Sequence, residues 1–238
     1  MKKIFKWFLA ILITLLILSI TVIGIVKSKT YQPSLAAQNA AKTSTVVNNT
    51  TKFQGDDSKP SVIFYPGALV EPKSYSIWAR NVAKAGYSVY IVHFPLDLAV
   101  LNSNAANRVQ GKNKYIIGGH SLGGTMALNY AKKHPRNLRG IFLLASYPEN
   151  KTNLHEIKVP VLSLTATNDG VLNHTNYQKT KKLLPNNTIY EQISGGNHAG
   201  FGSYGKQTGD NRASISNQKQ QNIVSKLLIN WLNQKISE

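Results

Sequence analysis

Cysteine is absent from this sequence of 238 residues. Its absence excludes disulfide bonds, a catalytic thiolate and zinc sites built on thiolate ligands. If the protein has a catalytic nucleophile, we therefore expect the attacking atom to be an oxygen. Charged residues are also few, at 16%, against 42% hydrophobic residues, which is the balance of a folded chain rather than a disordered one.

Acidic residues are scarce, with 10 Asp and Glu against 28 Lys and Arg, so the net charge is +18. From Pro60 onward the chain still carries 20 basic and 8 acidic residues, a net charge of +12. The positive electrostatic field of such a chain favours anionic neighbours, for example phospholipid headgroups or anionic envelope polymers. Solubility alone is an equally good reason for the excess of basic residues. The basic residues form no Arg-rich stripe and no motif interleaved with aromatics, so we expect no nucleic-acid partner.

The N-terminus contains a long hydrophobic run, the 20 uncharged residues from Trp7 to Val26. Lysines flank the run at positions 2, 3 and 6 and again at 27 and 29. A helix of this length spans about 30 Å, the thickness of one bilayer core, and so predicts a membrane anchor. The alternative is a signal peptide cleaved near Ala36, but the apolar region of a signal peptide is usually shorter, about 7 to 15 residues.

The chain is expected to divide into three parts. We predict an anchor over residues 1–29, a flexible linker rich in small and polar residues over 30–44, and one globular domain over 45–238. More lysines precede the hydrophobic run than follow it, so the positive-inside rule places the N-terminus in the cytoplasm. The predicted protein is therefore a single-pass protein of the cell membrane with an extracytoplasmic domain.

The globular part alternates between short apolar runs and helical stretches. Strands are predicted at 61–65, 88–92, 114–118, 140–144, 160–165 and 188–192, and helices at 72–85, 103–109, 122–133, 174–184 and 218–234. This alternation predicts an α/β fold with a doubly wound, mostly parallel sheet whose ligands bind at the carboxyl ends of the strands. Two short edge strands are expected near 46–47 and 52–53. The segments between later strands are too short for a large cap domain.

Ser121 is the candidate nucleophile. It lies in Gly119-His120-Ser121-Leu122-Gly123, directly after the strand expected at 114–118 and before the helix expected at 122–133. A serine on a sharp strand-to-helix turn needs small residues on both sides, because neighbouring backbone approaches it closely. The alternative is a glycine-rich turn whose serine has no chemical role.

A nucleophilic serine requires a base and an acid, in the chain order Ser, acid, His. Asp169 directly follows the strand expected at 160–165, and His198 follows the last expected strand. We predict Asp169 and His198 as catalytic partners of Ser121. Glu149, after the strand expected at 140–144, is a second candidate for the acid, and an Asx turn is the alternative role for Asp169.

Stabilising the negatively charged intermediate requires two N–H donors. The amide of Leu122 is the first candidate, since it follows the nucleophile. The loop after the first strand supplies the second, for which we predict Ala68 with Leu69 as the alternative. Phe201 and Tyr204 follow the predicted base on a glycine-rich loop and are expected to bind substrate, with surface packing as the alternative.

These motifs together resemble a known family. They are Phe-Tyr-Pro-Gly at 64–67, Val-Glu-Pro at 70–72, Pro-Leu at 95–96, the glycine-rich segment at 118–124, Asn-Asp-Gly at 168–170 and Gly-Gly-Asn-His-Ala at 195–199. In this order, and over about 61–232, the chain resembles the bacterial α/β hydrolases, in particular compact, lidless serine hydrolases related to dienelactone hydrolases and carboxylesterases. The resemblance implies the triad and oxyanion hole named above.

We therefore expect a serine hydrolase that cleaves a small carboxylic ester through an acyl-enzyme intermediate, without a cofactor or a metal. Two alternatives stay open at this point. One is transfer of an acyl group to a cell-surface glycan. The other is a non-catalytic interaction module bound to the envelope through its basic surface.

Overall fold

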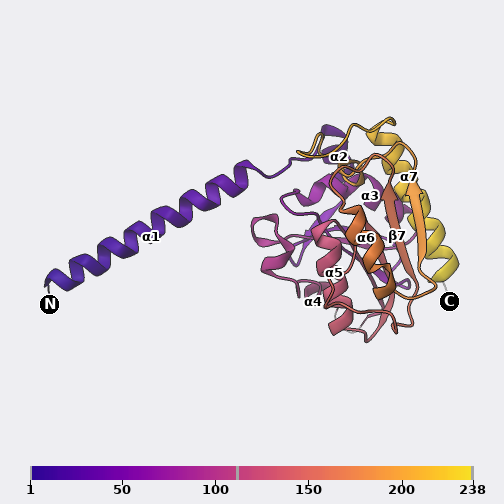
Figure 1. Ribbon diagram of the computed structural model, residues 1–238, viewed down its shortest axis with the longest axis horizontal. Coiled ribbons are helices and arrows are strands. Elements are labelled where there is room, and N and C mark those ends of the chain that lie inside the picture. Colours follow the sequence, from indigo (N-terminus) through magenta and orange to yellow (C-terminus); the bar gives the residue numbers. More distant parts are fainter. Residues whose placement is uncertain (1, 111–112, 237–238) are drawn as a thin grey trace. The chain divides into compact units, whose positions relative to one another are not determined.

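The computed structural model describes residues 2–110 and 113–236 of the chain. The chain forms two compact units, Met1–Thr30 and Tyr31–Glu238 (Figure 1). The first unit contains a single helix, α1 (Lys2–Ser28). The second contains all strands and the remaining helices.

Helix α1 has lysines near both ends and is uncharged from Trp7 to Val26. Its segment Ile4–Ser28 is long and hydrophobic enough to cross a membrane, a property that signal sequences share. The hydroxyl groups within it donate to backbone carbonyls one turn earlier, Thr14 to Ala10 at 2.9 Å and Thr21 to Ile17 at 2.9 Å. Such bonds satisfy the hydroxyls inside the helix, as an apolar environment requires.

The second unit is built on one eight-stranded sheet with the order β1-β2-β4-β3-β5-β6-β7-β8. The strands are β1 (Thr45–Val47), β2 (Thr50–Phe53), β3 (Ser61–Tyr65), β4 (Val89–Val92), β5 (Tyr115–His120), β6 (Leu138–Leu144), β7 (Val161–Ala166) and β8 (Ile189–Ile193). Strands β1 and β2 are antiparallel to each other, β2 is antiparallel to β4, and all other pairs are parallel. The predicted α/β fold with a mostly parallel sheet is thus confirmed.

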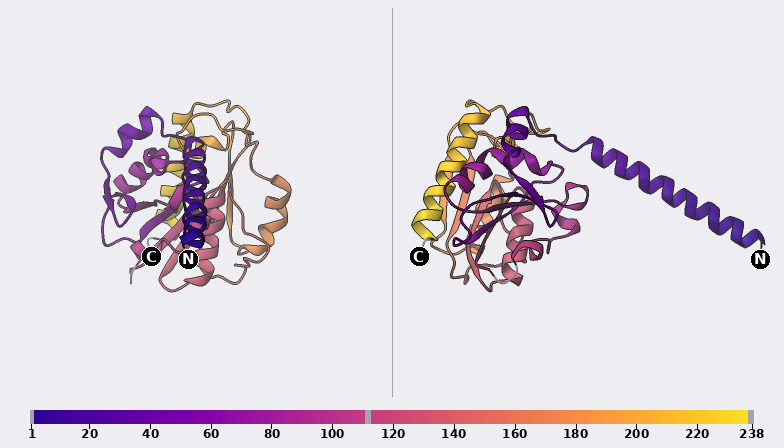
Figure 2. Two further views of the ribbon diagram at one scale, coloured as in Figure 1. Left: turned by 90° about the vertical axis from the view of Figure 1, so that its left-hand side faces the viewer. Right: turned by 180° about the vertical axis from the view of Figure 1, so that it is seen from behind.

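Helices cover both faces of the sheet (Figures 1 and 2). Side chains of α3 (Ser76–Lys84) and α7 (Asn217–Lys235) form one apolar cluster with alternate residues of the strands, such as Phe64 and Phe142. On the other face, α5 (Leu122–Lys133) packs on the intervening residues, such as Ile63 and Ile117. The central strands are therefore buried on both sides, as is typical of a parallel sheet.

The shorter elements lie between these main ones. They are α2 (Leu35–Ala41), α4 (Asn107–Gln110), α6 (His174–Thr180), and the 3₁₀ helices η1 (Pro72–Tyr75), η2 (Pro95–Asp97), η3 (Ala99–Leu101), η4 (Lys181–Leu183) and η5 (Ala199–Phe201). Within the described residues, the segment between β6 and β7 contains no helix or strand. The fold therefore has no large cap domain, as predicted.

The segment before the first strand differs from the prediction. We expected a flexible linker over residues 30–44, but α2 forms there, and Ala37 and Ala40 pack against Ile77 of α3. The side chain of Ser34 caps the helix by accepting from the amide of Ala37 at 3.2 Å. Small residues at helical spacing allow α2 to lie close to α3, a contact that composition alone does not reveal.

Candidate active site

Ser121 occupies a strained turn between β5 and α5. Its backbone has φ 51° and ψ −126°, a conformation that costs free energy for a residue with a side chain. Two hydrogen bonds to neighbouring strand ends hold the turn: the amide of Ser121 donates to the carbonyl of Leu144 at 3.0 Å, and its carbonyl accepts from Ser146 Oγ at 2.7 Å. The sharp strand-to-helix turn that the sequence predicts at Ser121 is therefore present.

Gly123 is required by the close approach of the loop after β3. A Cβ atom at position 123 would lie 2.1 Å from the carbonyl oxygen of Pro66 and 2.3 Å from that of Tyr65. Because such distances are impossible for a real side chain, glycine at this position lets the loop lie directly on the first turn of α5. This packing brings the loop that contains Ala68 near the nucleophile's helix.

Asp169 and His198 form a buried pair. The distance from His198 Nδ1 to Asp169 Oδ2 is 2.9 Å, and the two residues are 1% and 4% exposed. The other carboxylate oxygen of Asp169 accepts from the amides of Val171 at 2.9 Å and Leu172 at 2.8 Å. The structure thus brings the predicted acid and base into direct contact.

The surroundings of Asp169 keep it ionised. Burial alone raises the pKa of the carboxyl group, but the hydrogen bond from His198 and those from the amides of Leu172 and Val171 outweigh burial and hold the pKa below its usual value. An ionised Asp169 can only accept a hydrogen bond at Oδ2, so Nδ1 of His198 carries the hydrogen. In the neutral ring the lone pair then lies on Nε2, the nitrogen that a general base needs.

Ser121 and His198 line one cavity of about 330 Å³. Its walls also include Leu122, Thr125, Ala145, Ser146, Tyr147, Glu149, Val171, Leu172 and Asn173. Glu149, the alternative acid, lines the cavity but bonds elsewhere: its Oε2 accepts from Asn129 Nδ2 at 2.9 Å and lies 3.5 Å from Lys151 Nζ. The structure therefore places Asp169, and not Glu149, on the histidine.

The loop after β3 distinguishes the two candidates for the second oxyanion donor. The amide of Leu69 donates to the carbonyl of Asp97 at 2.9 Å, and that of Gly67 donates to Tyr75 Oη at 2.9 Å. In the described part of the chain, the amides of Ala68 and Leu122 have no recorded acceptor. The geometry favours Ala68 over Leu69 because only an uncommitted N–H can bind an oxyanion.

Phe201 and Tyr204 do not lie on the cavity that Ser121 lines, although we predicted that they bind substrate. Phe201 is fully buried, with its ring centroid 5.7 Å from that of His120. Tyr204 packs on Tyr31 with centroids 5.4 Å apart, and its hydroxyl donates to Gln207 at 2.8 Å. Both rings fill the protein interior, so the walls next to the nucleophile come instead from the loops after β6 and β7.

His120 is a buried histidine behind the base. Its ring centroid is 4.5 Å from that of His198, and its Nδ1 lies 2.9 Å from Tyr75 Oη. Burial, and secondly the neighbouring His198, hold the pKa of His120 well below its usual value. The side chain of His120 lies beneath the site and connects the loop at Gly67, through Tyr75, with the base.

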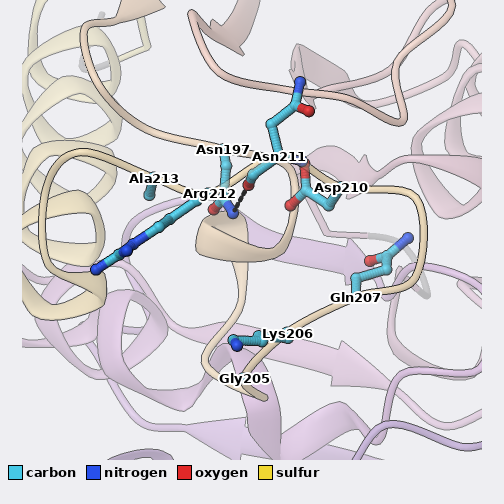
Figure 3. Close-up of a pocket in the computed structure, with 8 residues that line it drawn as sticks. All are labelled: Asn197, Gly205, Lys206, Gln207, Asp210, Asn211, Arg212 and Ala213. Atoms are coloured by element: carbon cyan, nitrogen blue, oxygen red, sulfur yellow. Dashed lines mark hydrogen bonds between the residues drawn. The ribbon is translucent and has the colours of Figure 1, made fainter.

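Asp210 joins the two turns that carry the acid and the base. Its Oδ1 accepts from the amides of Gly170 at 3.1 Å and His198 at 3.3 Å, and its Oδ2 accepts from Ala199 at 2.8 Å. In the loop drawn in Figure 3, Asp210 lies beside Asn211, whose carbonyl accepts from Asn197 Nδ2 at 2.7 Å. Sequence reasoning missed Asp210. The only available signal was an isolated acidic residue in a basic chain, 12 positions after the histidine.

No metal site accompanies these residues. Among the residues described, no three His, Asp or Glu side chains group closely enough to hold a metal ion. Asp169 is bonded to His198, and His198 lines one cavity with Ser121, so these three side chains are candidates for an orienting carboxylate, a general base and a nucleophile.

Comparison with known proteins supports the fold. The chain matches the model of the alpha/beta hydrolase family over residues 61–222, whereas no curated protein matches it. It is similar in structure to a dienelactone hydrolase from Anabaena variabilis, at TM-score 0.58 and 14% identity, with 79% of this chain and 91% of that one covered. A carboxylesterase from Bacillus subtilis is similar at TM-score 0.57 and 11% identity, with 83% and 97% covered. A predicted CIB-like hydrolase from Thermoplasma acidophilum gives TM-score 0.57 and 16% identity, with 76% and 91% covered.

At these identities the structural similarities establish the fold, and the family match covers more than half of the chain. The resemblance read from the sequence motifs is thereby confirmed. The protein belongs to the alpha/beta hydrolase family.

Proposed function

We propose that the protein is a serine hydrolase that cleaves a carboxylic ester through a triad of Ser121, His198 and Asp169. The observation that carries this proposal is the 2.9 Å contact between His198 and Asp169, together with the cavity that His198 shares with the strained Ser121. Membership of a hydrolase family, with esterases among its structural neighbours, supports the same reaction class.

The proposed reaction has two halves. Ser121 Oγ attacks the ester carbonyl while His198 Nε2 accepts its proton, and the amides of Ala68 and Leu122 donate to the developing oxyanion. Collapse of the intermediate releases the alcohol, which takes the proton from His198. A water molecule then attacks the acyl-enzyme while His198 takes its proton. The bond between the acyl group and Ser121 Oγ breaks, His198 returns the proton to Oγ, and the carboxylic acid leaves.

A covalent probe tests the nucleophile. A fluorophosphonate should label the wild type at Ser121, and Ser121→Ala should lose both labelling and hydrolysis of an activated ester by several orders of magnitude. Ser58→Ala, at an exposed serine in a surface turn, is the matched control and should behave like the wild type. Labelling that persists in Ser121→Ala would place the reactive serine elsewhere.

We further propose that α1 remains attached and holds the domain at the outer side of the cell membrane. The apolar segment Ile4–Ser28 and its flanking lysines support this arrangement. The proposed partners are a small ester substrate, the membrane around α1, and anionic envelope polymers at the basic surface. Protease added to intact cells should digest the domain. Protection until lysis, or recovery of a soluble shortened chain, would contradict the anchor.

A further inference from the structure

The cavity beside Ser121 has an unusual charge for this protein. The chain as a whole carries a net charge of +18, yet no Lys or Arg is among the described residues that line the cavity. One carboxylate, that of Glu149, is among them. The cavity wall is therefore unfavourable for an anionic group of a substrate and favourable for a cationic one.

Glu149 is held in a fixed position on this wall. Its Oε2 accepts from Asn129 Nδ2 at 2.9 Å, and the Asn129 side chain in turn accepts from Thr152 Oγ1. Its carbonyl accepts from the amide of Thr152 at 2.8 Å, which closes the turn after Glu149. In the described structure Oε1 of Glu149 has no recorded hydrogen bond, so one carboxylate oxygen can accept a contact from a ligand.

Lys151 is a cation near Glu149 that competes weakly with a ligand. Lys151 Nζ lies 3.5 Å from Oε2, and its side chain is 78% exposed. An exposed pair of this kind contributes little, because solvent screens it and two long side chains lose freedom. The Glu149 side chain is 37% exposed and is oriented by Asn129, so a cationic ligand in the cavity can compete with Lys151 for it.

An aromatic residue, Tyr147, is among the residues that line the same cavity. Its carbonyl accepts from Thr125 Oγ1 at 3.0 Å, which ties the loop to α5. Alkylammonium groups bind to aromatic side chains and carboxylates, since the ring and the carboxylate both attract positive charge while the alkyl substituents pack on the ring. Tyr147 and Glu149 offer both kinds of group within the same cavity as the nucleophile.

We propose that Tyr147 and Glu149 form a binding site for an alkylammonium group, and that the substrate is an ester carrying such a group in its acyl or alcohol part. The proposal rests on the ester hydrolysis proposed above and names the substrate class of that same site. Recognition at this site lowers KM for the cationic substrate without taking part in bond breaking.

Two pairs of isosteric substrates test the site. The first pair is 4-nitrophenyl 4-(trimethylammonio)butanoate and 4-nitrophenyl 5,5-dimethylhexanoate, which differ in the charge of the acyl part. The second is acetylthiocholine and S-(3,3-dimethylbutyl) thioacetate, which differ in the charge of the leaving group. In at least one pair, the wild type should prefer the cationic member in kcat/KM by about tenfold, a difference of about 1.4 kcal/mol.

Glu149→Gln should abolish this preference, mainly through KM, so that the ratio of kcat/KM between the cationic and the neutral member falls to about one. Glutamine keeps an oxygen that accepts from Asn129, so the neutral ester also reports that the site is intact. Glu156→Gln is the matched control, because it removes the same charge from a side chain that is 95% exposed and does not line the cavity. Added salt should weaken the preference in the wild type.

The outcomes separate this inference from the proposed function. If the wild type hydrolyses the neutral esters but prefers neither cationic substrate, the alkylammonium site is refuted and ester hydrolysis stands. The alkylammonium site is also refuted if Glu156→Gln reduces the preference as much as Glu149→Gln does, since the electrostatic field of the whole protein then accounts for the preference. If the wild type hydrolyses none of the four esters, the ester hydrolase itself is refuted.

Discussion

The two sides of Ser121 are held in place by different kinds of interaction. On the histidine side, the carboxylates of Asp169 and Asp210 accept hydrogen bonds from backbone amides of two separate loops, including those of Leu172 and Ala199. On the oxyanion side, neutral groups and close packing hold the loop: Tyr75 Oη accepts from Gly67, and Pro66 lies on the helix at Gly123.

This difference determines which kind of substitution should disrupt each side. Hydrogen bonds to an ionised carboxylate are about twice as strong as neutral ones, so the histidine side depends on charge and fails when a carboxylate is neutralised. The oxyanion side depends on close contact between backbone segments, so it fails when atoms are added. Substitutions of each kind can therefore test the comparison.

The largest effect should come from Asp169→Asn. The amide cannot hold His198 in the required tautomer or stabilise its protonated form, and we expect kcat to fall by about 10⁴-fold. The measurement is steady-state hydrolysis of a neutral activated ester. Glu149→Gln is the control and should change kcat on that ester by less than about twofold, and the reverse ranking would assign the acid to Glu149.

Gly123→Ala tests the oxyanion side. The added Cβ would lie 2.1 Å from the carbonyl oxygen of Pro66, so the loop must move away and take its N–H donor with it. Loss of one oxyanion donor lowers kcat by about 10²- to 10³-fold. Fluorophosphonate labelling and the melting temperature should be measured alongside kcat, because a folded variant with normal kcat would show that the close approach is not needed.

Asp210→Asn tests the histidine side without touching the triad. An amide nitrogen would replace one oxygen that now accepts from backbone N–H groups, so the turns of Asp169 and His198 should separate slightly. A small misplacement of the reacting groups can lower the reaction rate by about 10²-fold, and we expect kcat to fall by up to that amount. Asp57→Asn, in an exposed turn, provides the same chemical change as a control. Normal kcat in Asp210→Asn would show that the two turns are held without this carboxylate.

The smallest effect concerns acid stability. Because the folded pKa of His120 is depressed, the unfolded chain binds the proton first, so the free energy of unfolding decreases as the pH falls below about 6.5, the usual value for histidine. The decrease continues down to the folded pKa, with a slope of at most about 1.4 kcal/mol per pH unit. His120→Gln should flatten the curve between pH 7.5 and pH 5.5 in denaturant titrations. An unchanged slope would assign the acid sensitivity to other groups.

The sequence predicted the framework of the site because its signals are local. The strand at Ser61–Tyr65 and the helix at Leu122–Lys133 appear where the apolar runs indicated them. Strand ends were shifted by one or two residues, as at Tyr115–His120, because hydrogen bonding to neighbouring strands sets the end of a strand. The predicted helix at 72–85 divides into Pro72–Tyr75 and Ser76–Lys84.

By itself, the sequence determined that a strained serine turn follows a buried strand, with an acid and a histidine after later strands, because glycine spacing and hydrophobic runs act over a few residues. Only the tertiary structure committed the amide of Leu69 to the carbonyl of Asp97, buried Phe201 in the core, ordered the segment Leu35–Ala41, and placed Asp210 between two turns. Each of these outcomes depends on contacts between residues far apart in the chain. The partners in such contacts are set by how the layers pack, and no local pattern specifies them.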